Sequence, residues 1–533
     1  MDNKGLGLTS GELLDELREG RQLDWDIIVI GGGITGAGVL REAARRGYRA
    51  LLIEQSDFSW GTSSRSSKMI HGGLRYLVSG DINLTKHSLR ERERLIKEAP
   101  GLVERISFYF SLGKGLFPGR WAMTMALTIY DLIAGVRNRG YCNNNNLTHK
   151  FQGLDIGKLN GACFYSDAMV DDSRLVLRVL QESIAAGASA LNYTKVTDLM
   201  LEQEQVQGVV VKDQRTGQKI ELLAPVVINA TGAWADRLRS RVITEKRIRP
   251  LRGSHLIIPR ALCPVDDVLA FLHPQDKRNI YIYPWEGTTV IGTTDLDHPQ
   301  DLDIEASISE LETDYLIQGF SYLFPQTELQ RTHIISTWAG VRPVIGSDKS
   351  KDPSKERRDH AVWSDHGLIT VSGGKLTTFR LIALDVLEAA QPLLPEAPSL
   401  SDDRIFADTG LGPEDLKLND IEWAERLLGR YGSNTPTLLN EAQPEYCQPI
   451  AQTSFCLAEC QWALRNEAVV HLDDLLLRRT RLGMILPEGG AQLFDQLKSL
   501  CCSELNWTEQ QWQTELQRYN KIWQQYYSLP TDY

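Results

Sequence analysis

Residues 26–36 read Asp-Ile-Ile-Val-Ile-Gly-Gly-Gly-Ile-Thr-Gly, and this stretch decides the fold. An uninterrupted apolar run that ends in glycines is typical of a strand buried on both faces of a parallel sheet. Helix-forming residues follow at 34–47, and residues 49–53 (Arg-Ala-Leu-Leu-Ile) form a second apolar run. The pattern predicts a βαβ unit of the Rossmann type within an α/β fold.

The glycine-rich turn of this unit predicts a dinucleotide site. Gly31 permits a tight turn, Gly33 lets the backbone approach a pyrophosphate, and Gly36 lets helix and strand pack closely. The pyrophosphate would then meet the N–H groups and the positive dipole at the start of the helix. Glu54 ends the second run, where its carboxylate can accept hydrogen bonds from both ribose hydroxyls. An acid here disfavours NADP, because it would repel the 2′-phosphate.

Later segments favour FAD over NAD as the dinucleotide. Ala230-Thr231-Gly232 follows a third apolar run at 226–229, and Gly373-Gly374-Lys375 opens a late helix. The second of these would place further N–H donors near flavin or phosphate. NAD enzymes normally complete their site within one Rossmann half, whereas these pieces are spread from residue 31 to residue 375.

The overall composition limits the class of protein. A chain of 533 residues is too long for one ordinary core, and its 42% hydrophobic and 24% charged residues are typical of globular domains. A net charge of −11 argues against nucleic acid as a partner. The eight scattered cysteines fit neither a disulfide framework nor a metal site, so we expect free buried thiols and no metal. Neither a signal peptide nor an apolar run of about 20 residues is present, which predicts a cytoplasmic protein.

We expect three regions. Residues 1–24 read as a polar leader with one short helical period at Leu13, Leu14 and Leu17. Residues 25–395 are expected to form a discontinuous FAD-binding domain, at about 25–100, 160–245 and 340–395, with an inserted β-rich substrate domain at about 246–339. Beyond the prolines at 392, 395 and 398 the composition becomes helical, which predicts a C-terminal helical domain over 396–533.

Seven short motifs identify a family. In chain order they are Ser63-Ser64-Arg65-Ser66-Ser67-Lys68, His71-Gly72-Gly73-Leu74-Arg75-Tyr76-Leu77, Val170-Asp171-Asp172-Ser173-Arg174-Leu175, Gly253-Ser254-His255, Ile291-Gly292-Thr293-Thr294-Asp295, Gly340-Val341-Arg342-Pro343 and Gly373-Gly374-Lys375-Leu376-Thr377-Thr378. Together they resemble the FAD-dependent glycerol-3-phosphate dehydrogenases of the respiratory type, from about residue 25 to 385 and more weakly at 431–434 and 478–484. The resemblance implies a glutathione-reductase-like FAD domain, a β-rich substrate domain and a helical C-terminal cap.

The resemblance also implies an activity. Glycerol 3-phosphate would be oxidised to dihydroxyacetone phosphate, with hydride passing from C2 to flavin N5 and electrons then passing to a membrane quinone. This implies peripheral contact with the cytoplasmic face of the inner membrane, and it allows for a homodimer. Two alternatives stay open: an oxidase that uses oxygen, and a flavoprotein that oxidises another hydroxy acid or an amino acid.

We expect non-covalent FAD, because no histidine or cysteine lies in a recognised attachment motif. His71, beside the serine-rich loop, is expected to contact the flavin. The full set of expected cofactor contacts is Gly31, Gly33, Ile34, Thr35, Gly36, Glu54, Ser63, Ser64, Ser67, Lys68, His71, Gly72, Gly73, Val196, Ala230, Thr231, Gly232, Gly373, Gly374, Lys375 and Leu376.

A phosphorylated substrate requires several cations. Arg75, Arg342 and Lys375 each lie in a glycine-bounded turn, where a long side chain can reach a ligand. Lys375 could equally lie near flavin N1 and stabilise the reduced anion. Tyr76, which could hydrogen-bond the substrate or simply pack, and Arg358, from a looser match to the family, complete the expected substrate contacts.

His255 begins an apolar strand and has two interpretations: a satisfied histidine at a strand end, or a general base. We predict that it takes the proton from the C2 hydroxyl, because neighbouring cations would lower its pKa and keep it neutral. Together with the two cations Arg342 and Lys375, His255 makes up the predicted set of catalytic residues.

Three further segments carry a structural interpretation beside a functional one. Asp171-Asp172 is predicted to begin a helix. Residues 116–134 are apolar but too interrupted to span a membrane, so they form either a buried helix or an interfacial one. Arg478, Arg479 and Arg481 could form a patch for lipid headgroups.

Overall fold

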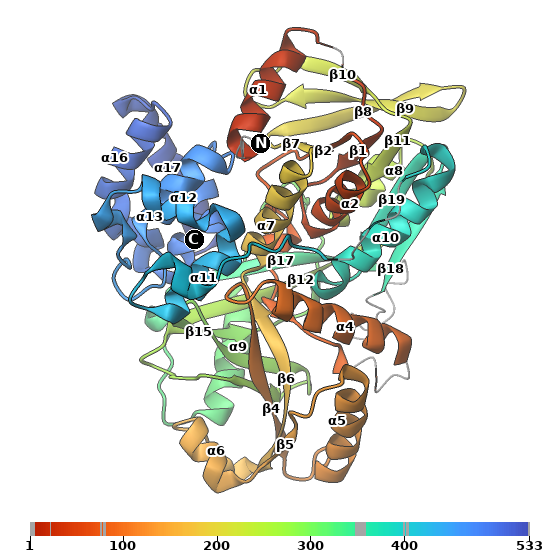
Figure 1. Ribbon diagram of the computed structural model, residues 1–533. Coiled ribbons are helices and arrows are strands. Elements are labelled where there is room, and N and C mark those ends of the chain that lie inside the picture. The colour runs from red at the N-terminus through yellow and green to blue at the C-terminus, as the bar shows by residue number, and fades with distance from the viewer. Residues whose placement is uncertain are drawn as a thin grey trace.

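A computed structural model describes residues 6–21, 23–74, 77, 82–346, 359–397, 400 and 404–530. A parallel sheet with its helices occupies the upper part of Figure 1, a second β domain lies below it, and the C-terminal helices lie to the left of both. The candidate site lies between the first two of these regions, because residues from both line one cavity.

The upper sheet has six strands in the order β18-β19-β11-β1-β2-β7. Its parallel members are β1 (Ile27–Ile30), β2 (Ala50–Ile53), β7 (Ser189–Leu191), β11 (Val226–Asn229) and β19 (Leu368–Gly373), and β18 (His360–Asp365) is antiparallel to β19. The helices α2 (Ile34–Arg45), α7 (Asp172–Ala185) and α10 (Phe379–Ala390) pack together against one face. Both faces of β1 are buried, which explains its apolar run and confirms the βαβ unit.

The other face of this sheet carries a three-stranded antiparallel sheet, β8 (Thr194–Glu202), β9 (Gln205–Asp213) and β10 (Lys219–Leu223), together with the helix α1 (Leu6–Arg18). Leu13, Leu14 and Leu17 of α1 are buried in this layer, so the short helical period is confirmed. Arg18 also pairs with Asp213 at 2.5 Å. The helix α1 within the expected polar leader is therefore a packed part of this layer.

The second sheet has ten strands. They are β3 (Met69–Ile70), β4 (Val103–Gly113), β5 (Gly140–Cys142), β6 (Leu159–Val170), β12 (Ile248–Pro259), β13 (Val268–Leu272), β14 (Asn279–Trp285), β15 (Thr288–Gly292), β16 (Leu296–Asp297) and β17 (Ser336–Ile345). A parallel pairing of β4 with β13 joins the two halves of the sheet. The expected insert at about 246–339 covers only one half, because residues 69–70 and 103–170 contribute the other.

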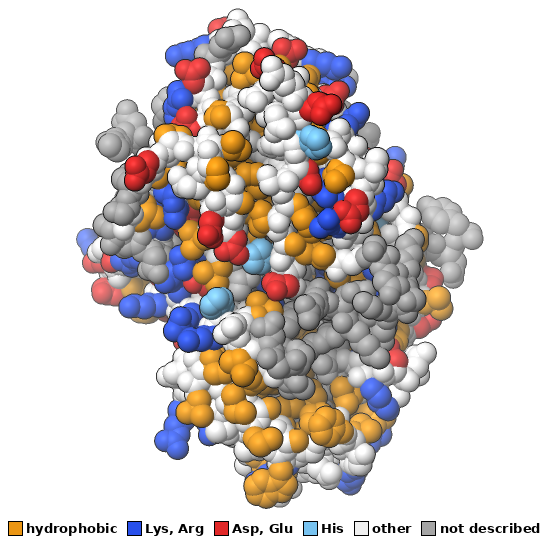
Figure 2. Space-filling model, turned by 90° about the vertical axis from the view of Figure 1, so that its right-hand side faces the viewer, with side chains coloured by type: hydrophobic (Ala, Val, Ile, Leu, Met, Phe, Trp, Pro, Cys, Tyr) orange, Lys and Arg blue, Asp and Glu red, His pale blue; other side chains and the backbone are white. Residues whose placement is uncertain are grey.

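Helices flank this sheet: α4 (Ile82–Glu98), α5 (Arg120–Ala134), α6 (Asn144–Lys150) and α9 (Glu310–Leu323). Met123, Leu127 and Tyr130 of α5 are buried, but Phe117, just before the helix, and Trp121 within it are 80% and 81% exposed. Figure 2 shows hydrophobic side chains gathered at the lower end of the molecule, where α5 lies in Figure 1. Residues 116–134 are thus only half buried. No helix in the described part of the chain is long and apolar enough to cross a membrane.

The C-terminal region is helical, as the resemblance implies. It contains α11 (Ile421–Tyr431), α12 (Thr435–Glu441), α13 (Leu457–Asn466), α14 (Leu472–Asp474), α15 (Leu482–Ile485), α16 (Phe494–Glu504) and α17 (Glu509–Tyr526). After α17 the chain returns to the second sheet, where Thr337 donates its N–H to the carbonyl of Tyr527 at 2.7 Å.

The expected headgroup patch at Arg478, Arg479 and Arg481 is wrong. All three side chains are buried, with at most 1% exposed, because each pairs with carboxylates of the FAD domain. Arg481, for example, donates from Nε to Asp171 at 3.1 Å. Asp171 also caps α7 by accepting the N–H of Arg174 at 3.2 Å, so the predicted helix start is confirmed.

Candidate active site

A cavity of about 600 Å³ lies at the carboxyl ends of β1, β2, β11 and β19, where they face the second sheet. Ligands of open α/β sheets bind in this position. Many of the expected residues line the cavity: Gly31, Gly33, Ile34, Thr35, Glu54, Ser63, Ser67, His71, Val196, Ala230, Thr231, Gly232, Arg342, Gly373, Gly374, Lys375 and Leu376. The fold therefore brings most of the predicted contacts together from distant parts of the chain.

The glycine turn has the shape of a pyrophosphate cradle. Gly31 has a φ of +112°, and a Cβ added there would lie 2.6 Å from the carbonyl oxygen of Ala230. A Cβ on Gly36 would lie 1.9 Å from the carbonyl oxygen of Gly31, so this glycine permits close packing of helix and strand. Gly33 precedes the first turn of α2, which directs its N-terminus at the cavity. This geometry fits a bound dinucleotide.

Glu54 lies at the end of β2 with its carboxylate fixed by the backbone. The N–H groups of Gly32 and Ser56 donate to its two oxygens at 2.6 and 2.8 Å. Burial raises the pKa of Glu54 in spite of these donors. Its position on the cavity wall suits the predicted contact with ribose hydroxyls.

Two of the predicted substrate contacts, both cationic, lie on the cavity wall. Arg342, on β17, donates to the Asp295 carboxylate at 3.2 Å and to the Thr293 hydroxyl at 3.3 Å. Its guanidinium lies over Gly253, where an added Cβ would be 2.3 Å from Nη2. Lys375 follows β19 and donates from Nζ to the Ser88 hydroxyl at 3.2 Å. Arg342 and Lys375 each bring a cationic group to the cavity wall, where it suits an anionic ligand, although Arg342 also pairs with Asp295.

His255 lies one side chain behind the cavity wall. Its Nε2 is 2.9 Å from the hydroxyl of Ser67, which does line the cavity, and its Nδ1 has no hydrogen-bond partner among the described residues. The ring stacks on Trp338 at 4.5 Å and fits against Gly292, where a Cβ would be 2.1 Å from Cδ2. Burial, with Arg342 and Lys68 adding to it, holds the pKa of His255 well below its usual value.

Lys68 does not face the cavity. Its Nζ donates to Asp172 at 3.0 Å and to the carbonyl of Ser64 at 3.2 Å, and it lies 4.7 Å from the Trp338 ring. Burial lowers its pKa to about 8. The Lys68 ammonium thus occupies a supporting position beside Trp338, and the expected contact of this residue with the cofactor stays a prediction.

Several other expected residues also lie off the cavity wall. They are Gly36, Ser64, Gly72 and Gly73. Gly72 is closely packed instead, since a Cβ there would lie 2.2 Å from the Leu89 side chain. The predicted substrate contacts Arg75, Tyr76 and Arg358 lie outside the described residues.

Some lining residues escaped prediction. Trp60 and Trp234 face each other with ring centroids 5.9 Å apart, and the Arg65 guanidinium lies 4.9 Å from the Trp60 ring. Arg65 belongs to the serine-rich motif and Trp234 closely follows Ala230-Thr231-Gly232. Their nearness to these motifs in the sequence could have indicated that both line the site. Arg237 also lines the cavity, paired with Asp301 and Asp303, and no local signal indicates it.

Comparisons with known proteins find relatives along most of the chain. Residues 26–380 match the model of the FAD dependent oxidoreductase family, and residues 414–512 match the C-terminal domain of alpha-glycerophosphate oxidase. The chain is 32% identical to an aerobic glycerol-3-phosphate dehydrogenase of Staphylococcus haemolyticus, covering 86% of each chain. It is also 32% identical to a glycerol-3-phosphate dehydrogenase of Mycobacterium leprae, covering 93% of this chain and 87% of the relative.

A solved structure extends the likeness to three dimensions. The glycerol-3-phosphate dehydrogenase of Bacillus halodurans, crystallised with FAD, aligns with a TM-score of 0.76 at 28% identity and covers 96% of this chain and 98% of its own. These matches span both the FAD-binding and the C-terminal regions. The chain belongs to the FAD-dependent oxidoreductases and, within them, to the glycerol-3-phosphate dehydrogenase family.

Proposed function

We propose that this protein oxidises glycerol 3-phosphate to dihydroxyacetone phosphate with non-covalent FAD. The observation that carries the proposal is a single cavity lined both by the dinucleotide cradle at Gly31 and by the cationic side chains of Arg342 and Lys375. The curated relatives that carry this activity in their names support the same substrate. Bound FAD would supply the hydride acceptor, and the chain's own residues would bind the phosphate and remove the proton.

Phosphate binding falls to Arg342 in this proposal. Its guanidinium is fixed by Thr293 and Asp295, so it can present N–H donors to a phosphate in a defined direction. An amino acid or hydroxy acid would present a carboxylate, which one arginine satisfies. Lys375 lines the same cavity and adds a second cation, which favours the dianionic phosphate over a carboxylate. This agrees with the expectation that the glycine-bounded turns supply several cations for a phosphorylated substrate.

Proton removal falls to His255 acting through Ser67. As the C2–H bond breaks and its electron pair leaves as hydride, the C2 hydroxyl proton passes to Ser67 Oγ, whose own proton passes to His255 Nε2, and the carbonyl forms. The 2.9 Å contact between Nε2 and Oγ supports this route. The lowered pKa of His255 supports it as well, because a neutral imidazole can accept the proton.

Anaerobic reduction of the bound flavin tests the proposal. The holoenzyme is mixed without oxygen with glycerol 3-phosphate, glycerol, and a panel of 2-hydroxy acids and amino acids, and bleaching of the flavin absorption band is followed. Rapid bleaching by glycerol 3-phosphate alone is expected. Faster bleaching by a carboxylic acid of the panel would reject glycerol 3-phosphate as the substrate.

We further propose that the electrons pass to a membrane quinone at the cytoplasmic face of the inner membrane. The support is the exposed apolar surface of α5 and the residues before it, Leu116, Phe117, Trp121, Met125 and Leu132. Lys114 and Arg120 flank this surface, and a cationic border beside exposed aromatic side chains is typical of interfacial helices. An oxidase would transfer the electrons to oxygen instead. Rapid formation of peroxide when the reduced enzyme meets oxygen would therefore identify an oxidase, and rapid reduction of an added quinone would identify a quinone-linked dehydrogenase.

A further inference from the structure

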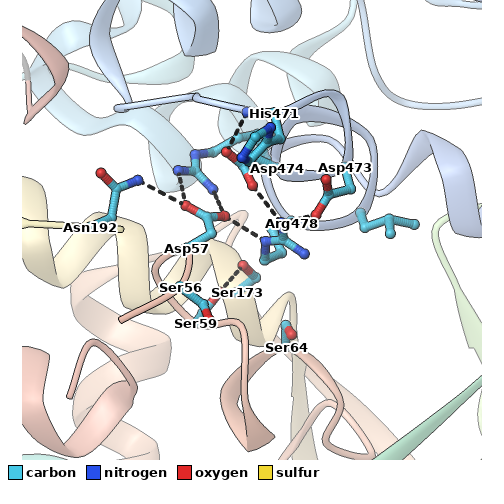
Figure 3. Close-up of polar contacts among 12 residues, drawn as sticks. Ser56, Asp57, Ser59, Ser64, Ser173, Asn192, His471, Asp473, Asp474 and Arg478 are labelled. Carbon is cyan, nitrogen blue, oxygen red and sulfur yellow. Dashed lines mark hydrogen bonds and ion pairs between the residues drawn. The ribbon is translucent and has the colours of Figure 1, made fainter. Parts of the chain in front are cut away.

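The C-terminal helical domain contacts the FAD-binding loop, residues 54–67, through buried arginines. Asp57 in this loop is fully buried and accepts from Arg479 Nη1 and Nη2 at 2.6 and 2.8 Å and from Arg478 Nε at 2.5 Å. Arg481 donates to the carbonyl of Ser64, farther along the same loop, at 3.2 Å. Figure 3 shows Asp57 between Asn192 on one side and Arg478 on the other, with Asp473 and Asp474 above Arg478.

The same loop is joined to the glycine turn. Ser59 donates its N–H to the carbonyl of Gly32 at 2.9 Å, and the N–H of Ile34 donates to Ser63 Oγ at 3.0 Å. Glu54, three residues before Asp57, accepts the N–H of Gly32. A displacement of Asp57 would therefore also move the Glu54 carboxylate, which is expected to contact the ribose, and the glycine turn that forms the pyrophosphate cradle.

The charges of this contact depend on one another. Burial alone would raise the pKa of Asp57, but Arg479 and Arg478 outweigh it and hold the pKa below its usual value. Arg478 in turn donates to Asp473 and Asp474 at 2.7 and 2.6 Å. Removing one member of such a buried set leaves a charge without compensation, which is strongly unfavourable.

The described part of the C-terminal domain contacts the FAD loop and does not line the cavity. No described residue beyond Leu376 lines the cavity, so these residues make no contact with the space where FAD fits. We propose that Arg479 and Arg478 are positioning residues that hold the loop 54–67 through Asp57, so that docking of the C-terminal domain sets the rate at which FAD leaves. The inference rests on FAD binding and not on the identity of the substrate.

The rate of FAD release from the holoenzyme tests this proposal. The variants Asp57→Asn and Arg479→Gln are diluted at temperatures below unfolding, and the rise in free flavin fluorescence is recorded beside the circular dichroism of the same sample. We expect release at least about tenfold faster while the protein stays folded, the factor that corresponds to loss of a hydrogen bond between charged groups.

Glu286→Gln provides a matched control. Glu286 accepts from Arg430 of the C-terminal domain at 3.1 Å, but it lies just after β14 and outside the FAD loop. The same change of carboxylate to amide should leave FAD release at the parental rate. Equal acceleration by Glu286→Gln and Asp57→Asn would mean that general loosening releases FAD, and it would overturn the proposal.

The double variant Asp57→Asn with Arg479→Gln covers the case in which a single variant does not fold. It removes charge from both sides of the contact, although Arg478 keeps its pairing with Asp473 and Asp474. Its amides should hold the loop less firmly, so FAD should again leave faster than from the parent. Parental release from a folded double variant, or from either folded single variant, would show that the loop is positioned by other contacts.

Discussion

Replacing Arg342 by alanine should impair the use of glycerol 3-phosphate without a comparable effect on an unphosphorylated polyol. The guanidinium lies on the cavity wall, fixed by Thr293 and Asp295, where a phosphate can accept a charge-assisted hydrogen bond. Loss of one such bond costs about 1.5–3 kcal/mol, a factor of roughly 10 to 150 in kcat/KM. The side chain is 22% exposed, so solvent screening favours the lower part of this range.

The assay compares two substrates on one variant. Anaerobic flavin reduction is measured with glycerol 3-phosphate and with glycerol, and the loss should fall on the phosphorylated substrate, because glycerol has no group to contact Arg342. Arg342→Lys should give an intermediate loss, since lysine keeps the charge but not the planar pair of donors.

Arg237→Ala is the matched control for this prediction. Arg237 lines the same cavity, but it pairs with Asp301 and Asp303, so its loss should leave the preference between the two substrates unchanged. Equal losses on glycerol 3-phosphate and glycerol in Arg342→Ala would refute the reasoning. Arg342 would then hold the flavin or the second sheet and not the phosphate.

The remaining predictions concern the cofactor, the base and the membrane surface. Glu54→Ala should weaken FAD binding by about 1–3 kcal/mol through the lost ribose contact, and unchanged affinity in a titration would remove Glu54 from the site. Flavin should leave with the supernatant after acid precipitation, and flavin retained in the pellet would reveal a covalent link. Because the pKa of His255 is depressed, its neutral basic form persists well below pH 6.5, and flavin reduction should fall only as pH drops through that lowered pKa. His255→Gln should slow flavin reduction by roughly 10²–10⁴-fold and abolish this acidic limb, and a surviving limb would assign it to another group. Trp121→Ser should reduce sedimentation of the protein with anionic lipid vesicles while activity on the soluble substrate is kept. Unchanged sedimentation would show that α5 does not bind the membrane.

The parts of the fold that the sequence predicted are those with a local cause. An apolar run such as 27–30 must be buried on both faces wherever it lies, and Gly31 is required by a positive φ within its own turn. Gly373 and Gly374 likewise adopt positive φ values of 81° and 79°. Each of these positions could be assigned without knowledge of its neighbours in space.

The parts that prediction missed depend on partners far away in sequence. Arg478 and Arg479 resemble a surface patch until Asp57, more than 420 residues earlier, is seen to accept from both. The second sheet was underestimated for the same reason, because the β4–β13 pairing joins Phe108 to Val268, a residue 160 positions later in the sequence. Lys68 has a serine-rich neighbourhood that suggests a ligand contact, yet its Nζ points at Asp172.

One set of charges connects the base to the C-terminal domain. His255 stacks on one side of the site against Trp338, and the Lys68 ammonium lies 4.7 Å from the same ring. Asp172 binds Lys68 and also accepts from Arg481, so the ammonium is held in place by a carboxylate that the C-terminal domain shares. The cation that helps to keep His255 neutral is therefore positioned through the same segment, residues 478–481, that contacts the FAD loop. Through this segment the C-terminal domain contacts both the FAD loop, at Asp57 and Ser64, and the carboxylate of Asp172 that binds Lys68.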